Sequence, residues 1–104
     1  MTVQHLDAAL KAVCSDTYET AVPRNLTRYV CWHQYRRASL YGNDRNQLDA
    51  PRVQIDIIMD QDQDTLVDDV CAALWMLDLP YTVEAEGYDD EYCAYRTILQ
   101  LVVI

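Results

Sequence analysis

The stretch "RVQIDIIMD" (Arg52 to Asp60) decides how the rest of the chain has to fold. Its side chains form two alternating sets, of which the apolar one is Val53, Ile55, Ile57 and Met59. The other set is Gln54, Asp56, Ile58 and Asp60. Successive side chains of a strand point to opposite faces, so the pattern predicts a strand with one buried face. Other elements of the chain must cover that face.

A helix is predicted directly after this strand. The apolar residues then recur at the spacing of one helix face, at Leu66, Val67, Val70, Cys71, Leu74 and Leu77. The acidic run "MDQDQDTLVDD" (Met59 to Asp69) therefore lies at the N-terminus of the helix. An aspartate at that position accepts hydrogen bonds from unpaired backbone N–H groups, so we expect Asp62 or Asp64 to cap the helix.

The same acidic run could instead be a calcium-binding loop. Such a loop needs glycine at its sixth position and glutamate at its twelfth. Counted from Asp60, these positions hold Thr65 and Cys71, so both requirements fail. The sequence therefore favours helix capping and predicts no metal site.

Elements on either side of the central strand complete the predicted fold. Residues 3–14 have the spacing of an amphipathic helix, and residues 28–36 form an aromatic strand. Two more strands follow Pro80, with a short edge strand possible before Pro23. We expect residues 1–104 to form a single α+β domain, with an antiparallel sheet of about four strands and two helices packed on one face.

The last strand contains "ILQLVVI" (Ile98 to Ile104), which has apolar side chains on both faces. Leu99, Leu101 and Val103 share one face and are predicted to join the core. The opposite face carries Arg96, Ile98, Gln100, Val102 and Ile104. Helices on only one side of the sheet would leave this second face exposed to solvent, so we expect a neighbouring subunit to cover it.

Composition excludes several classes of protein. The formal charge of −9 argues against unspecific binding to nucleic acid, which requires clustered Lys and Arg. No apolar run reaches the ~20 residues that span a bilayer. The four cysteines are far apart and form no C-x-x-C pair, which gives no support for a zinc site with His33. We expect reduced thiols and no cofactor.

Charge is divided unevenly along the chain. Residues 24–52 hold six bases and two acids, whereas residues 53–95 hold twelve acids and no Lys or Arg. A head-to-tail interface closes a ring when unlike patches of one subunit meet across the contact. The charge division therefore fits a ring, although the acids could also simply keep a helix face solvated.

Two other classes of function remain open on the residues alone. A small metal-dependent hydrolase or nuclease could use Asp56, Asp60 and His33, although strand ends and helix caps account for these carboxylates without a site. A cytosolic regulatory or antitoxin-like binding module is the other alternative.

Short motifs across nearly the whole chain resemble a family of phage proteins. These are the aromatic strand, "LYGND" (Leu40 to Asp44), "VQIDIIMD" (Val53 to Asp60) and the ending "GYDDEYCAYRTILQLVV". The pattern is similar to that of tail terminator proteins, also called tail-completion or head–tail joining proteins, of long-tailed bacteriophages and prophages. Tyr92-Cys93 and Tyr95-Arg96 depart from the usual threonine and tyrosine-histidine of that family.

The resemblance implies a virion protein with no catalytic residues. It implies a homo-oligomeric ring, expected to be a hexamer, that caps the tail tube and meets the head-side connector while DNA passes through the lumen without specific binding. The protein would assemble in the host cytoplasm and then belong to the virion. The resemblance and the charge map together place the subunit interface at Arg36, Arg37, Tyr41, Asp44, Arg45, Asp68, Asp69, Val102 and Ile104.

Overall fold

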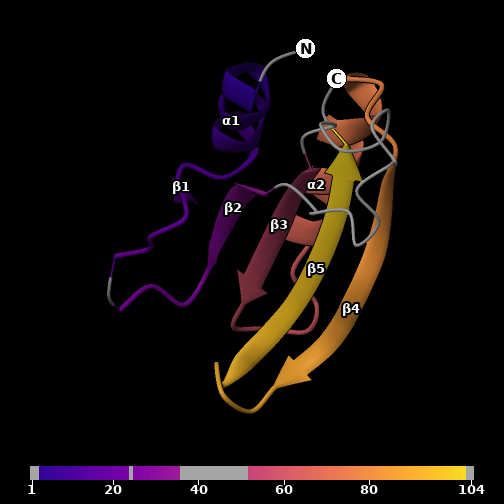
Figure 1. Ribbon diagram of the computed structural model, residues 1–104. Helices are drawn as coiled ribbons and strands as arrows, with labels where there is room; N and C mark the ends of the chain where they lie inside the picture. The colour runs from indigo at the N-terminus through magenta and orange to yellow at the C-terminus, as the bar shows by residue number, and fades with distance from the viewer. Residues whose placement is uncertain (1–2, 24, 36–51, 103–104) are drawn as a thin grey trace, which may run out of the picture.

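The computed structural model describes residues 3–23, 25–35 and 52–102 of the chain. Two helices, α1 (Val3–Val13) and α2 (Leu66–Met76), occur where the sequence predicts them. The strands are β1 (Thr17–Glu19), β2 (Tyr29–Tyr35), β3 (Arg52–Met59), β4 (Tyr81–Asp89) and β5 (Ala94–Val102). Both helices lie on the same face of the sheet, which confirms the predicted α+β arrangement (Figure 1).

The sheet differs from the prediction in strand number and direction. It has five strands in the order β1-β2-β3-β5-β4, and β1 runs parallel to β2 while the other pairs are antiparallel. The sheet is therefore mixed, rather than four-stranded and antiparallel. β1 has only three residues, too few for a clear alternation. The Thr17 hydroxyl fixes its start by donating a 2.6 Å hydrogen bond to the Cys14 carbonyl at the end of α1.

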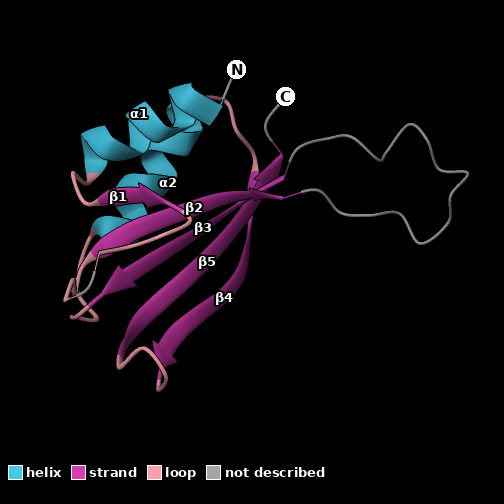
Figure 2. Cartoon of the chain, turned by 60° about the vertical axis from the view of Figure 1, so that its left-hand side comes forward, coloured by secondary structure: helices cyan, strands magenta, loops and turns pink. Residues whose placement is uncertain are grey.

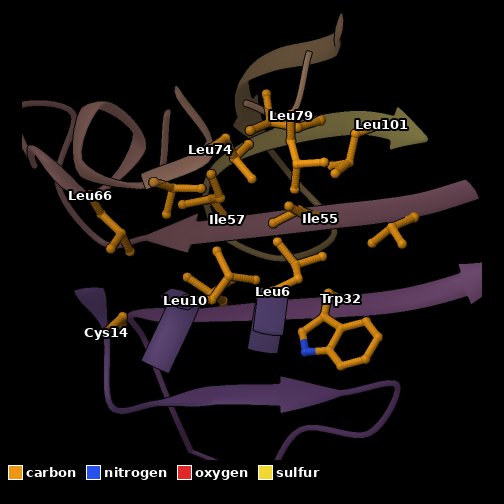
Figure 3. Packing of buried hydrophobic residues seen from close by; sticks show 14 of the residues in the cluster. Leu6, Leu10, Cys14, Trp32, Ile55, Ile57, Leu66, Leu74, Leu79 and Leu101 are labelled. Atoms are coloured by element: carbon orange, nitrogen blue, oxygen red, sulfur yellow. The ribbon is translucent and has the colours of Figure 1, made fainter. Parts of the chain in front are cut away.

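The core fills the space between the helices and the sheet (Figure 3). The inward set of β3 is fully or almost fully buried, as the alternation predicted. Leu99 and Leu101 of β5 join it, also as predicted. On β2 the inward residues are Val30 and Trp32. The helices contribute Leu6, Leu10, Leu66, Val70 and Leu74.

Replacing a core residue of β5 tests this assignment. We expect Leu101→Ala to lower the free energy of unfolding by about 2–5 kcal/mol, because a buried leucine leaves a cavity when truncated. Gln100→Ala is the matched control, since its side chain lies half-buried on the other face of the same strand. Its expected effect is within about 0.5 kcal/mol. Urea denaturation measures both, and equal losses would contradict the assignment of faces.

The N-cap residue of α2 is Thr65, whose side chain makes no capping hydrogen bond, so neither Asp62 nor Asp64 is the N-cap as predicted. Asp64, one residue earlier, still contacts the start of the helix. Asp64 accepts a 3.0 Å hydrogen bond from the backbone N–H of Leu66, the first helical residue. It also accepts two hydrogen bonds from the Arg28 guanidinium, at 2.6 and 3.0 Å. Asp60 and Asp62 are exposed. Asp64 therefore ties the start of α2 to the loop before β2, a connection that the local sequence pattern does not contain.

Two variants separate these roles of Asp64. Asp64→Ala removes both the helix contact and the ion pair and is expected to cost about 1–2 kcal/mol. Asp64→Asn keeps an acceptor for Leu66 and should cost less. The ion pair with Arg28 lowers the pKa of Asp64 in the folded protein. Its contribution is therefore complete above the ordinary value of about 4 and is lost as pH falls through the lower folded value.

Urea denaturation from pH 7 down to pH 2 measures this dependence. The stability difference between the natural protein and Asp64→Asn should be largest at neutral pH and shrink at acidic pH. A difference that stays constant with pH would show that the charge of Asp64 contributes nothing.

Candidate functional site

The sheet has a second face that neither helix covers, and we call it the helix-free face (Figure 2). The register places alternate residues of three strands side by side on it, with Asp56 of β3 between Cys31 of β2 and Ile98 of β5. These positions alternate with core positions, so their side chains point away from the helices. The face comprises Tyr29, Cys31, His33, Tyr35, Arg52, Gln54, Asp56, Ile58, Arg96, Ile98 and Gln100.

Arg96 is the centre of the interactions on the helix-free face. Its Nη2 donates to Asp56 Oδ2 at 2.9 Å, and its Nη1 donates to Asp89 Oδ2 at 3.2 Å. Its guanidinium carbon also lies 4.5 Å from the centre of the Tyr92 ring, a cation–π contact. One arginine thus joins β3, β5, the end of β4 and the turn that follows β4.

Asp89 also organises the turn between β4 and β5. Its Oδ1 accepts hydrogen bonds from the backbone N–H groups of Glu91 at 2.9 Å and Tyr92 at 3.2 Å. Partial burial by itself raises the pKa of Asp89, but the hydrogen bonds from Tyr92 and Arg96 outweigh that effect and lower it. The carboxylate therefore stays ionised at neutral pH and keeps both the turn and Arg96 in place.

The thiol of Cys31, on the helix-free face, does not have the properties of a reactive nucleophile. Burial raises the pKa of Cys31, and the charge of Asp56 across the register raises it further. The thiol is therefore protonated at neutral pH, whereas a reactive cysteine needs a lowered pKa. All four cysteines are free thiols.

The three residues considered for metal-dependent catalysis are not brought together. His33 pairs in register with Gln54, and Asp60 follows the far end of β3. Gln54, the partner of His33, is six residues from Asp60 along the chain, which corresponds to about 20 Å in a strand. Asp56 lies between them and is paired with Arg96. One ion cannot bind all three side chains at this spacing.

The predicted interface residues fall into separate regions. Asp68 and Asp69 are exposed in the first turn of α2, on the other side of the sheet from the helix-free face. Val102 ends β5, in register with Arg52. The remaining residues lie outside the described part of the chain, as does the "LYGND" segment: Arg36, Arg37, Tyr41, Asp44, Arg45 and Ile104.

Two large apolar side chains that the sequence analysis did not single out are exposed on α2. Trp75 is 80% exposed and Met76 is 83% exposed. Their helical positions fall on the same side as Asp68 and Asp69. We call these four residues the α2 patch. The signal was present in the sequence, because Trp75 and Met76 fall outside the apolar stripe that packs into the core.

Three comparisons with known proteins found no match for this chain. No family model matches the sequence, no curated protein matches it, and no solved structure matches it either. Among the described residues, no group of three or more His, Cys, Asp or Glu side chains could hold a metal ion. In the same part of the chain, no helix is long and apolar enough to cross a membrane. The resemblance to phage tail terminators stays a prediction.

The Arg96 pairs can be tested by a double-mutant cycle. Arg96→Ala is expected to lower the free energy of unfolding by about 1–3 kcal/mol, since it leaves the largely buried Asp56 without its partner. Combining it with Asp56→Asn should recover part of this loss, because the unpaired charge is then also removed. Arg96→Lys is the control that keeps the positive charge but lacks the planar guanidinium group and its several donors. Additive losses in urea denaturation would mean that the pair is not coupled.

Proposed function

We propose that this chain is a non-enzymatic virion protein of a phage or prophage that assembles into a ring, expected to be hexameric, at the end of the tail. In this role it terminates the tail tube and allows docking to the head-side connector. The observation that carries the proposal is the helix-free face, which neither described helix covers and where Ile98 and several aromatic side chains lie half-buried. The resemblance of the sequence motifs supplies the particular role.

A second surface supports ring formation rather than a symmetric pair. The α2 patch lies on the opposite side of the molecule from the helix-free face, and it exposes Trp75 and Met76 beside two carboxylates. Exposed apolar side chains of this size are a frequent mark of a protein contact. Two different patches on opposite sides suit a head-to-tail contact, which closes into a ring when the rotation permits.

Charge fits the same arrangement. The described residues between 53 and 95 include twelve acids and no Lys or Arg, and Asp68 and Asp69 are exposed. The Arg28–Asp64 pair uses one of the six bases of residues 24–52 within the subunit. The remaining bases can serve the neighbouring subunit. A net negative ring would also let DNA pass through its lumen without binding.

The arrangement of carboxylates favours this role over a hydrolase. Asp56 is committed to Arg96, and Asp60 and His33 lie far from one another along the sheet. The proposed partners are therefore other copies of the chain, the tail tube protein and the connector. Assembly would take place in the host cytoplasm, followed by incorporation into the virion.

Single charge substitutions on the two patches test the proposal. We expect Ile98→Asp and Trp75→Asp each to abolish the ring in sedimentation, because each buries an unpaired charge in the contact. Trp75→Asp should melt close to the natural protein, since Trp75 is exposed. Ile98→Asp should stay folded but melt somewhat lower, because its carboxylate stands opposite Asp56 in the register. Association of the natural protein should also weaken between about 0.05 and 0.5 M salt, where surface charges are increasingly screened.

Mixing the two variants gives the sharper result. Each retains the patch that the other has lost, so a head-to-tail contact predicts dimers that grow no further. A symmetric contact predicts no recovery on mixing. Ser15→Asp, at an exposed position between α1 and β1 and outside both patches, is the matched control and should leave the ring intact. A natural protein that stays monomeric at every concentration and salt, also with the purified tail tube as template, would overturn the proposal.

A further inference from the structure

β4 differs from every other strand of the sheet. It is the last strand in the sheet order, so among the described residues one of its edges has no hydrogen-bonding partner. Most of its side chains are exposed on both faces, including Val83 at 51% and Tyr88 at 57%. Backbone N–H and C=O groups along such an edge can pair with another chain.

The β4 edge is regular only after a shift in its pairing with β5. The pairing between β4 and β5 shifts between Val83 and Ala85, and from Ala85 to Asp89 it then runs without interruption. This five-residue segment is about 17 Å long. Gly87 adopts a φ of +142°, and a Cβ added there would meet nothing within 4 Å. No side chain therefore crowds the backbone at Gly87, in the middle of this segment.

A groove of about 600 Å³ lies along the same segment on the helix side of the sheet. Glu86 and Gly87 form one wall, and Asp62, Asp64 and Asp68 at the start of α2 form the other. We call it the acidic groove. Within the described residues, no ion pair joins Asp62, Asp68 or Glu86 to a base. Arg96 reaches the groove but already pairs with Asp56 and Asp89.

Charge identifies what can pair with this edge. Two β4 edges would bring Glu84 and Glu86 of one copy close to the same residues of the other, and like charges across strands are destabilising. The opposite edge strand of the sheet, β1, also carries an acid, Glu19, and Asp16 directly precedes it. Pairing between the sheet edges of two copies is therefore opposed. A basic strand would instead meet three unpaired carboxylates.

We propose that the Ala85–Asp89 edge of β4 binds an extended segment of a different protein that is rich in lysine or arginine. The segment adds to the sheet as a further strand through backbone hydrogen bonds. Its alternate side chains enter the acidic groove, because one face of an added strand points to the helix side. Backbone pairing supplies affinity, and the carboxylates select a basic sequence. This binding does not depend on the proposed ring.

Three synthetic peptides of about nine residues, the length of β4, test the inference. The first alternates lysine and valine, the second alternates glutamate and valine, and the third is the lysine peptide with every second amide N-methylated along one edge. Fluorescence polarisation measures binding, and amide hydrogen exchange locates it. We expect the lysine peptide alone to bind and to protect those amides of Ala85–Asp89 that point away from β5.

Neutralising the groove provides the matched variant. Asp62→Asn combined with Glu86→Gln should weaken binding of the lysine peptide about tenfold, as expected for the loss of two charged contacts. Asp78→Asn combined with Glu19→Gln removes the same charge elsewhere and should leave binding unchanged. All four positions lie outside the helix-free face and the α2 patch, so peptide binding and ring formation can fail independently.

Several outcomes would overturn the inference. Equal binding of the N-methylated peptide would mean that the groove attracts cations without strand addition. No binding by any peptide would exclude the docking site. In the free protein the amides that pair with β5 are protected in any case. Protection of the outward-pointing amides of Ala85–Asp89 in the free protein would show that the chain itself, or a second copy if the protection disappears on dilution, already occupies the edge.

Discussion

The central strand β3 is the element on which the rest of the structure depends. It is hydrogen-bonded to β2 on one side and to β5 on the other, so its position sets the register of both. Its inward side chains, from Val53 to Met59, are the floor on which α1 and α2 pack. Both helices lie over this one face. The other face of the sheet is left for polar interactions or for another molecule, and this asymmetry underlies the functional proposal.

Two arginines join parts of an acidic chain that are far apart in sequence. Arg28 pairs with Asp64 and thereby positions the start of α2 against the loop before β2. Arg96 joins Asp56 of β3 to Asp89 at the end of β4. Each guanidinium offers several donors in a fixed plane, which suits it to hold two acceptors at once. With a formal charge of −9, the chain has few bases to spare. Arg28 and Arg96 are placed where they connect separate elements, whereas Lys11 pairs with Asp7 inside α1.

The surfaces of the molecule have different chemical characters. The helix-free face is a mixture of aromatic, apolar and amide side chains around the ion pairs of Arg96, whose buried Nε has no hydrogen-bond partner among the described residues, and this mixture suits a broad protein contact. The α2 patch places Trp75 and Met76 beside Asp68 and Asp69. The β4 edge offers backbone groups beside an acidic groove, which suits a narrow, extended partner. The α2 patch and the acidic groove share Asp68, whereas Glu86 and the Ala85–Asp89 edge belong to neither of the first two surfaces.

Most of the fold could be predicted from the sequence, because apolar residues recur at the spacing of strands and helices. The alternation of β3 and the helical spacing from Leu66 to Leu74 each predicted an element and its buried face, because burial imposes a regular period on the side chains. The contact of an aspartate with the start of α2 was also predictable, since Asp64 and Leu66 are close in sequence, but the N-cap residue itself is Thr65. The helix-free face was expected from the apolar residues on both sides of the last strand.

Tertiary structure alone decided the features that depend on distant residues. β1 was too short for a pattern, and its parallel pairing with β2 arises from the path of the chain after α1. The inward face of β2 was ambiguous because both of its faces are partly apolar, and packing against α1 selected Val30 and Trp32. The partners of Arg28 and Arg96 lie 36 and 40 residues away in sequence. Such contacts leave no local period, so only the assembled sheet brings those side chains within hydrogen-bond distance.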